Sequence, residues 1–313
     1  MSEAVLVAIL SGAVLAATPI LYAAAGEIIA ELSGVLNLGV EGMMLVGAMV
    51  AFSVEATIGS LWTAVLAGMA AGAIVGCVHA VLTVTLAVDQ VVSGLAITLF
   101  GTGVSSYLGR PYISVHVPAR LPPVAVPGLA HLPYLGPILF EQNALILASY
   151  VLVPALWAFL RYSGPGLSLR AVGESPRTAD AMGIDVFAVR YAAVTFGGMM
   201  AGLAGAFLST IYLASWTDGL TAGRGWIAIA LVVFAAWDPL KAMAGAYLFG
   251  FADVMAFQTQ VLGRITEVVP TYFVQMTPYI LTIFVLVLVS RAFARRRIGA
   301  PAGLMMAYRR EQR

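Results

Sequence analysis

The sequence predicts an all-α polytopic membrane protein with about nine transmembrane helices, and eight to ten are allowed. The first observation behind this fold class is composition: 61% of the 313 residues are hydrophobic and 10% are charged. Soluble domains are about 45–50% apolar and about 25% charged. The second is spacing, because most of the apolar residues form blocks near the length of about 20 residues that crosses a lipid bilayer. Together they exclude a soluble globular enzyme and a disordered chain.

We expect one transmembrane helix at each apolar block of the sequence. The second and seventh blocks are too short to cross a bilayer, so we expect them to extend into the polar residues that precede them. All the blocks lie within one transmembrane domain, residues 1–290. The blocks are Ala4–Ala25, Gly42–Val54, Leu61–Ala87, Val91–Leu108, Ala144–Leu160, Tyr191–Leu213, Gly225–Trp237, Ala242–Leu262 and Tyr272–Ser290.

Basic residues indicate which segments face the cytoplasm, because loops rich in Lys and Arg are retained on that side. The loop at residues 161–190 contains four arginines, and the tail at residues 291–313 contains seven. We therefore expect both segments, and the C-terminus, in the cytoplasm. The segment 109–141 has only two arginines and contains seven prolines, which disfavour a regular helix. It is expected to form an external loop.

The stretch at residues 27–45 interrupts the apolar pattern with three glutamates, one asparagine and several glycines. Irregular backbone at membrane depth is tolerated only where it is buried in protein or lines a watery cavity. We therefore expect a discontinuous helix beside a translocation path. A short cytoplasmic loop with capping residues is the alternative. The candidate path residues lie at this break and at the start of the next polar-flanked helix: Asn37, Glu41, Gln90 and Ser93.

Two further polar residues stand near or within apolar blocks. Ionisable groups inside a membrane are costly and are candidates for function. Asp253 lies in the middle of its block and is a candidate for a functional or structural pair. Arg224 stands between two glycines, where it could cap a half-helix or pair with an acid, and a structural role is favoured.

A short helix is predicted inside the arginine-rich loop. Ser175 and Pro176 are typical of a helix start, and Gly183 is typical of a helix end. A helix of about seven residues is marginal alone in water, so something else should hold it. It could dock into a groove on a soluble partner, and a surface helix without a partner is the alternative.

Glycines recur at four-residue spacing in two blocks, at Gly68, Gly72 and Gly76 and again at Gly198 and Gly202. This pattern lets transmembrane helices approach closely. Packing within one subunit is favoured over a dimer face.

Several motifs are absent from the sequence. There is no GxxxxGK[ST] phosphate loop, so the chain is not expected to hydrolyse ATP by that device. The three histidines are scattered, no catalytic constellation can be assembled, and no basic stripe suggests nucleic acid. We therefore expect no catalytic residue, cofactor, metal site or nucleic-acid partner.

Four stretches, at residues 31–47, 126–136, 169–185 and 222–239, resemble one family. This family comprises the permease subunits of ATP-binding-cassette (ABC) importers for nucleosides, simple sugars and branched-chain amino acids. The pattern is most similar to the nucleoside-type branch, usually the second of two permeases in one complex. Ala235 follows Phe234 here, where that branch commonly has a glycine.

The resemblance implies a permease that moves nucleosides, or simple sugars, inward by alternating access. It also implies a second permease subunit, cytoplasmic ABC ATPase subunits, an external substrate-binding lipoprotein and a place in the bacterial inner membrane. Within the loop 161–190, the residues expected to couple to the ATPase are Gly173, Glu174, Pro176, Ala181 and Gly183. The alternative is an ion-coupled secondary transporter that uses Glu41, Asp89 or Asp253.

Overall fold

The structure is a computed structural model, and it describes residues 3–117, 121–261 and 300–309 together with Met276, Ile280, Ile283 and Val287. The span expected at Tyr272–Ser290 and part of the basic tail therefore lie outside the described residues.

The described chain is almost entirely helical, which confirms the all-α class. Within the described residues, six helices, counted with the short π-helical or 3₁₀ turns that continue some of them, are long and apolar enough to cross a membrane: α1, α2, α3, α4, α5 and α8. The α-helices are α1 (Glu3–Leu32), α2 (Val40–Ile58), α3 (Leu61–Ala80), α4 (Gln90–Gly109), α5 (Ala144–Tyr162), α6 (Gly164–Glu174), α7 (Pro176–Ala181), α8 (Val186–Phe207), α9 (Arg224–Phe234) and α10 (Pro239–Val261).

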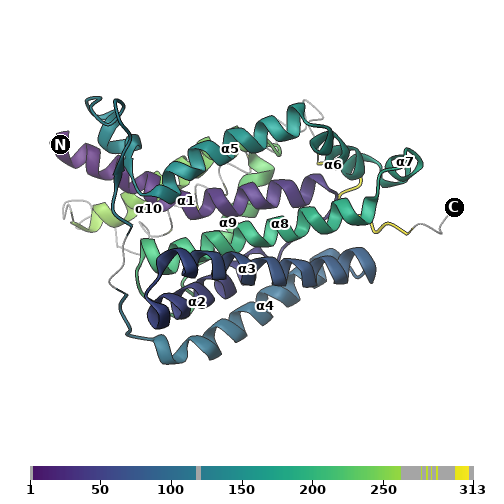
Figure 1. Cartoon of the computed structure of the whole chain (residues 1–313), viewed down its shortest axis with the longest axis horizontal. Helices are drawn as coiled ribbons and strands as arrows, with labels where there is room; N and C mark the ends of the chain where they lie inside the picture. Colours follow the sequence, from purple (N-terminus) through teal and green to yellow (C-terminus); the bar gives the residue numbers. More distant parts are fainter. Residues whose placement is uncertain are drawn as a thin grey trace.

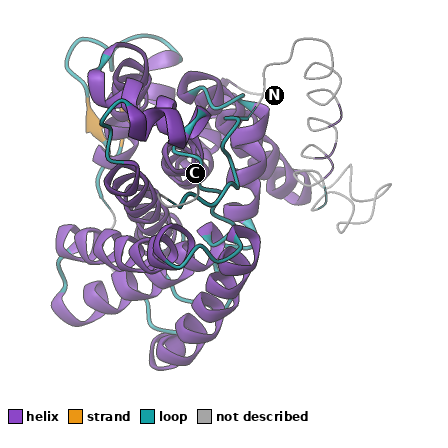
Figure 2. Ribbon diagram, turned by 90° about the vertical axis from the view of Figure 1, so that its right-hand side faces the viewer, coloured by secondary structure: helices purple, strands orange, loops and turns teal. Residues whose placement is uncertain are grey.

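The long helices lie side by side along one axis (Figure 1), and Figure 2 shows the bundle from the end that carries α7 and residues 300–309. The N-terminus of α1 lies at one end, and α6, α7 and residues 300–309 lie at the other. Helices α1 and α8 run antiparallel, because Gly26 faces Gly197 while Gly34 faces Arg190. Both helices are mostly buried and form the centre of the bundle.

The glycine pattern brings α3 and α8 into direct backbone contact, as the preferred interpretation predicts. A Cβ atom added at Gly72 would lie 2.2 Å from the carbonyl oxygen of Gly198, and one added at Gly202 would lie 2.3 Å from that of Gly68. Glycine at these positions therefore joins two helices of the same subunit.

The substitution Gly72→Ala should destabilise the protein, although alanine is the better helix former by about 1 kcal/mol. Its methyl group would push α3 and α8 apart, and overpacking of this kind costs about 1–3 kcal/mol. The matched control is Gly103→Ala, because a Cβ there meets nothing within 4 Å. The melting temperature in detergent should fall for the first variant and stay level or rise for the second, and equal melting temperatures would contradict this account.

The break after α1 is shorter than the sequence indicates. Helix α1 continues through Glu27 and Glu31 to Leu32, and only residues 33–39 are non-helical before α2 begins at Val40. The Gly42 block extends back into the preceding polar stretch, as expected, but only by two residues to Val40, and it also lengthens at its other end to Ile58. A positive φ of 90° at Gly34 turns the chain back into the bundle.

A second irregular segment, residues 213–223, follows η4 (Leu208–Tyr212), the π-helical turn that continues α8. We expected the Gly225 block to extend into this segment, and that expectation is wrong. Positive φ angles at Gly219, Ala222 and Gly223 are incompatible with a right-handed helix. Helix α9 therefore keeps only 11 residues, a length of about 16 Å, and cannot cross a bilayer alone.

The proline-rich segment 109–141 contains no α-helix in its described residues beyond the last residue of α4. It forms the 3₁₀ turn η2 (Arg110–Tyr112), the π-helical turn η3 (Gly136–Phe140) and the strand β1 (Val124–Ala125), which pairs antiparallel with β2 (Glu141–Gln142). Isolated bridges join Ile113 to Trp216 and His116 to Ser215. The loop is thus tied to the second irregular segment.

Candidate functional site

The first irregular segment, residues 33–39, is held by side chains from four helices, α1, α3, α4 and α8. The N–H of Leu36 donates to Gln90 Oε1 on α4 at 2.8 Å, and the N–H of Asn37 donates to Glu27 Oε1 on α1 at 3.0 Å. Buried backbone groups without a helical partner need such bonds, because an unpaired polar group in an apolar interior costs about 1–3 kcal/mol.

Further bonds complete this support. His79 on α3 bonds the carbonyl oxygen of Leu36 at 3.1 Å through Nε2 and the hydroxyl of Ser93 at 2.9 Å through Nδ1. The hydroxyl of Thr98 donates to the carbonyl oxygen of Leu38 at 2.9 Å. Asn37 Oδ1 accepts the N–H of Gly39 at 3.0 Å, which turns the chain into α2. The break is a defined structure, and it is buried.

The structure brings three of the four expected path residues together at this break. Asn37, Gln90 and Ser93 are buried and hold residues 33–39 in place, directly or through His79. Contact of these residues with a solute stays a prediction. The fourth residue, Glu41, lies one turn further on, in the first turn of α2, and faces the second irregular segment.

The carboxylate of Glu41 joins the two irregular segments. It accepts the hydroxyl of Thr221 at 2.5 Å, the N–H of Gly223 at 2.9 Å and the N–H of Gly225 at 2.7 Å. The last two donors belong to the start of α9, and Glu41 also lies in the first turn of α2. Two helix N-termini, each with a partial positive charge, therefore meet at one carboxylate.

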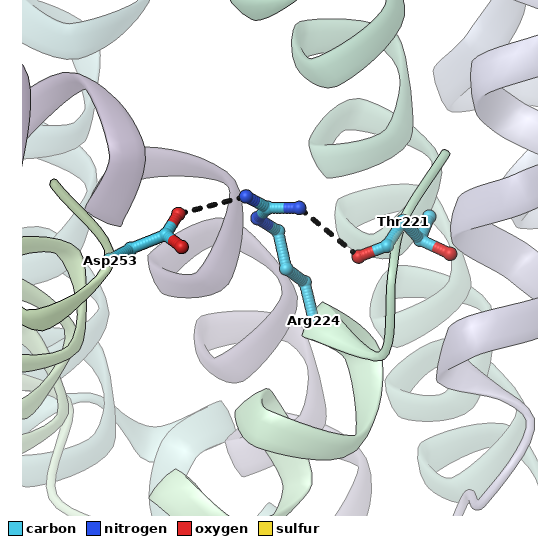
Figure 3. A network of polar contacts seen from close by, with 3 residues as sticks. All are labelled: Thr221, Arg224 and Asp253. Carbon is cyan, nitrogen blue, oxygen red and sulfur yellow. Dashed lines mark hydrogen bonds and ion pairs between the residues drawn. The ribbon is translucent and has the colours of Figure 1, made fainter. Parts of the chain in front are cut away.

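Beside this junction, Arg224 forms an ion pair with Asp253 of α10, with Nη2 2.8 Å from Oδ2. Nη1 of Arg224 also donates to the carbonyl oxygen of Thr221 at 3.4 Å, and Figure 3 shows the guanidinium between these two partners. Its Cζ lies 5.5 Å from the centroid of the Tyr212 ring. The pairing of Arg224 with an acid, considered from the sequence, is thus present.

The carboxylates on which ion coupling would depend are engaged. Glu41 and Asp253 have the partners described above, and Asp89 caps α4 by accepting the N–H of Val92 at 2.9 Å. In the described part of the chain, no group of three or more His, Cys, Asp or Glu residues could hold a metal ion.

At the end of the bundle that carries residues 300–309, α6 and α7 protrude beside the ends of α5 and α8 (Figure 1). Ser175 ends α6 and caps α7, accepting the N–H of Thr178 at 3.4 Å, so the predicted short helix is present. Of the expected coupling residues, Glu174, Ala181 and Gly183 are exposed and Pro176 is half-buried. Gly173 is buried and packs closely against α1, since a Cβ atom added there would lie 2.1 Å from the carbonyl oxygen of Leu32.

The segment 300–309 packs against these short helices. The N–H of Gly303 donates to the carbonyl oxygen of Gly173 at 2.8 Å, and the Tyr308 ring lies 5.9 Å from that of Phe187. Arg190, which is buried in α8, donates to the carbonyl oxygens of Ser33 at 3.2 Å and Met306 at 3.1 Å. One side chain thus connects the tail with the break after α1.

Residues of these networks that were not expected from the sequence include Thr98, Thr221, Tyr212 and Arg190 in its buried role. Arg190 was counted only as a loop charge, and nothing in its local sequence signals that it is buried. Thr221 stands two residues before the Gly-Arg-Gly triplet, which was a usable signal for a turn that presents backbone donors. Tyr212 ends an apolar block and gives no signal of its contact with Arg224.

Long apolar helices, two irregular segments inside the bundle and two helix N-termini that meet at a buried carboxylate define a class. They are typical of a multi-pass membrane transporter with broken helices.

The comparisons with known proteins agree with this class. Residues 8–289 match the family described as branched-chain amino acid transport system / permease component. The chain is 41% identical to the putative glucose ABC transporter permease protein TsgC13 of Haloferax volcanii, with 97% of this chain and 98% of that protein covered. It is 33% identical to the guanosine ABC transporter permease protein NupQ of Bacillus subtilis, with 91% and 93% covered.

A third relative is the nucleoside ABC transporter permease protein NupC of Lactococcus lactis subsp. cremoris, which is 34% identical over 90% of this chain and 92% of that protein. The chain belongs to the family of ABC transporter permease components, and its function as an importer permease is confirmed at this level.

Proposed function

We propose that the chain moves nucleosides or simple sugars into the cell, as one of two membrane subunits driven by separate ATPases. The relatives named above carry guanosine, nucleoside or glucose in their names. These solutes share a neutral, hydroxylated ring. In this proposal the chain itself catalyses no reaction and holds no cofactor.

The arginines favour one orientation of the protein. Arg161, Arg170 and Arg177 lie on or between the elements at the α6/α7 end, and positive residues are retained in the cytoplasm. That end, with residues 300–309, would face the cytoplasm. The proline-rich loop would then face outward and receive the substrate-binding lipoprotein. The protein would reside in the cytoplasmic membrane, the inner membrane of a bacterium.

One observation carries the energy-coupling part of the proposal: α6 and α7 form a protruding pair of short helices between two membrane-length helices. Met182 lies at their tip and is 78% exposed. An exposed apolar tip beside charged residues is suited to a groove on a soluble partner. Movement of the ATPase would reach the break after α1 through Gly173, which lies against Leu32.

The proposed solutes are tested by deletion and complementation in the source cell. Uptake of labelled guanosine, glucose and leucine is measured with and without the chain. The proposal expects that loss of the chain removes uptake of guanosine or glucose and leaves leucine uptake intact. Loss of leucine uptake alone would contradict the proposed substrate class.

The substitution Met182→Asp should weaken association with the ATPase at least tenfold, because a buried unpaired carboxylate at an interface costs several kcal/mol. Leu132→Asp is the matched control: Leu132 is also exposed, but it lies on the proline-rich loop. Co-purification of the ATPase with each variant is the measurement. An equal yield of ATPase with both variants would show that α7 is no docking site.

A further inference from the structure

The junction of the two irregular segments contains two positive features, and the chain neutralises both. The N-terminus of α9 holds the Glu41 carboxylate through the N–H groups of Gly223 and Gly225. Arg224 holds Asp253 at 2.8 Å. In broken-helix transporters a free helix N-terminus attracts an anionic group of the substrate. Here no positive group of the junction is left for an anionic solute, which favours a neutral one.

The ion pair is nevertheless accessible. The side chains of Arg224 and Asp253 are 13% and 21% exposed, whereas Glu41 is only 7% exposed. Asp253 uses Oδ2 for Arg224, and within the described residues its Oδ1 has no partner.

An aromatic face completes this arrangement. The half-buried Tyr212 ring lies 5.5 Å from Cζ of Arg224. Figure 3 shows Arg224 extended toward Asp253, with Thr221 on its other side. A ring, a guanidinium and a carboxylate thus lie together, where one solute could contact all three. A sugar ring has an apolar face for stacking and hydroxyl groups that both donate and accept.

We propose that Arg224, Asp253 and Tyr212 form a binding site for adjacent hydroxyl groups of a neutral solute that passes through the membrane. The proposal rests on the proposed function and names the contact residues for it. Asp253 accepts hydroxyl protons through Oδ1, Arg224 donates to a hydroxyl or ring oxygen, and Tyr212 packs against the ring. Glucose and the ribose of guanosine both carry adjacent hydroxyl groups, so one site serves both solutes.

The test compares solutes that differ by one hydroxyl group, in proteoliposomes that contain the complete purified transporter. Initial uptake rates are measured for guanosine and 2′-deoxyguanosine, and for glucose and 2-deoxyglucose. A hydroxyl bonded to a carboxylate should give a preference of about tenfold for the hydroxylated member of the transported pair. In Asp253→Asn this preference should fall to about threefold or less, because the charged acceptor is gone.

Two variants separate binding from a structural role. Asp218→Asn, which makes the same change at an exposed position, should keep the full preference. The double variant R224Q/D253N keeps polar partners of similar shape without the charges, and it should insert and lose the preference. If rates for both members of a pair fall by one factor in variants that insert normally, the ion pair is structural and the proposal is wrong.

A different result would refute the proposed function without refuting the proposed binding site. Uptake that continues with a catalytically dead ATPase would refute the ATP-driven permease, while the hydroxyl preference at Asp253 would still be measurable. Preferential uptake of leucine would overturn the proposed site, because it would assign Arg224 and Asp253 to the two charges of a zwitterion.

Discussion

Glu41→Gln is expected to reduce transport by tenfold or more while the protein still enters the membrane. The carboxylate accepts three hydrogen bonds, from Thr221, Gly223 and Gly225, and a glutamine amide must set its NH₂ group against one of these donors. Each hydrogen bond to a charged group contributes about 1.5–3 kcal/mol, so the junction of α2 with α9 should loosen. Uptake rates and the amount of protein in the membrane are the measurements.

Two further variants make this prediction specific. Glu141→Gln, at an exposed position, should leave transport unchanged. Thr221→Val removes one of the three donors and should have an intermediate effect, since the two backbone donors remain. If Glu41→Gln transports at the wild-type rate, the junction does not depend on the carboxylate.

Arg190→Met should release the C-terminal segment and abolish transport. Methionine fills much of the buried volume but leaves the carbonyl oxygens of Ser33 and Met306 without their donor, at a cost of about 1–3 kcal/mol each. Tyr308 is 8% exposed when the segment is docked. The measurement is chymotrypsin cleavage at Tyr308, which should become faster in the variant.

Arg170→Met is the control, because Arg170 is exposed on α6 and should not change cleavage at Tyr308. Arg190→Lys keeps a charge, but a single ammonium group cannot match the spread of a guanidinium over two carbonyl oxygens. It should give partial release. Wild-type resistance of Tyr308 in Arg190→Met would show that other contacts hold the segment.

The sequence predicts most of the fold because apolar block length and glycine spacing act locally. Helices α3, α4 and α5 begin within a residue or so of their predicted positions, and the caps of α7 follow from Ser175 and Gly183. The ends of α1 and α2 were placed less well, because Glu27 and Glu31 lie in a helix although they are charged. Their burial depends on partners far along the chain, such as Trp237, whose Nε1 donates to Glu31 at 2.5 Å.

The candidate site could be predicted only in part, because its residues are visible in the sequence but their distant partners are not. Asn37, Glu41, Gln90 and Ser93 stand out as polar residues beside apolar blocks. The structure places three of them at the break after α1, and Glu41 in the first turn of α2. Their contacts join positions up to 184 residues apart, as between Gly225 and Glu41. No local pattern specifies such pairs, so the roles of Thr221, Tyr212 and Arg190 required the three-dimensional structure.

In the proposed function, this chain converts ATP hydrolysis by separate subunits into solute movement. The direct measurement is uptake of labelled guanosine and glucose, supplied with the substrate-binding protein, into proteoliposomes whose ATPase side is loaded with ATP. The account predicts accumulation of at least one of them with ATP and none with a non-hydrolysable analogue. Equal accumulation with the analogue, or uptake driven by an ion gradient alone, would contradict it.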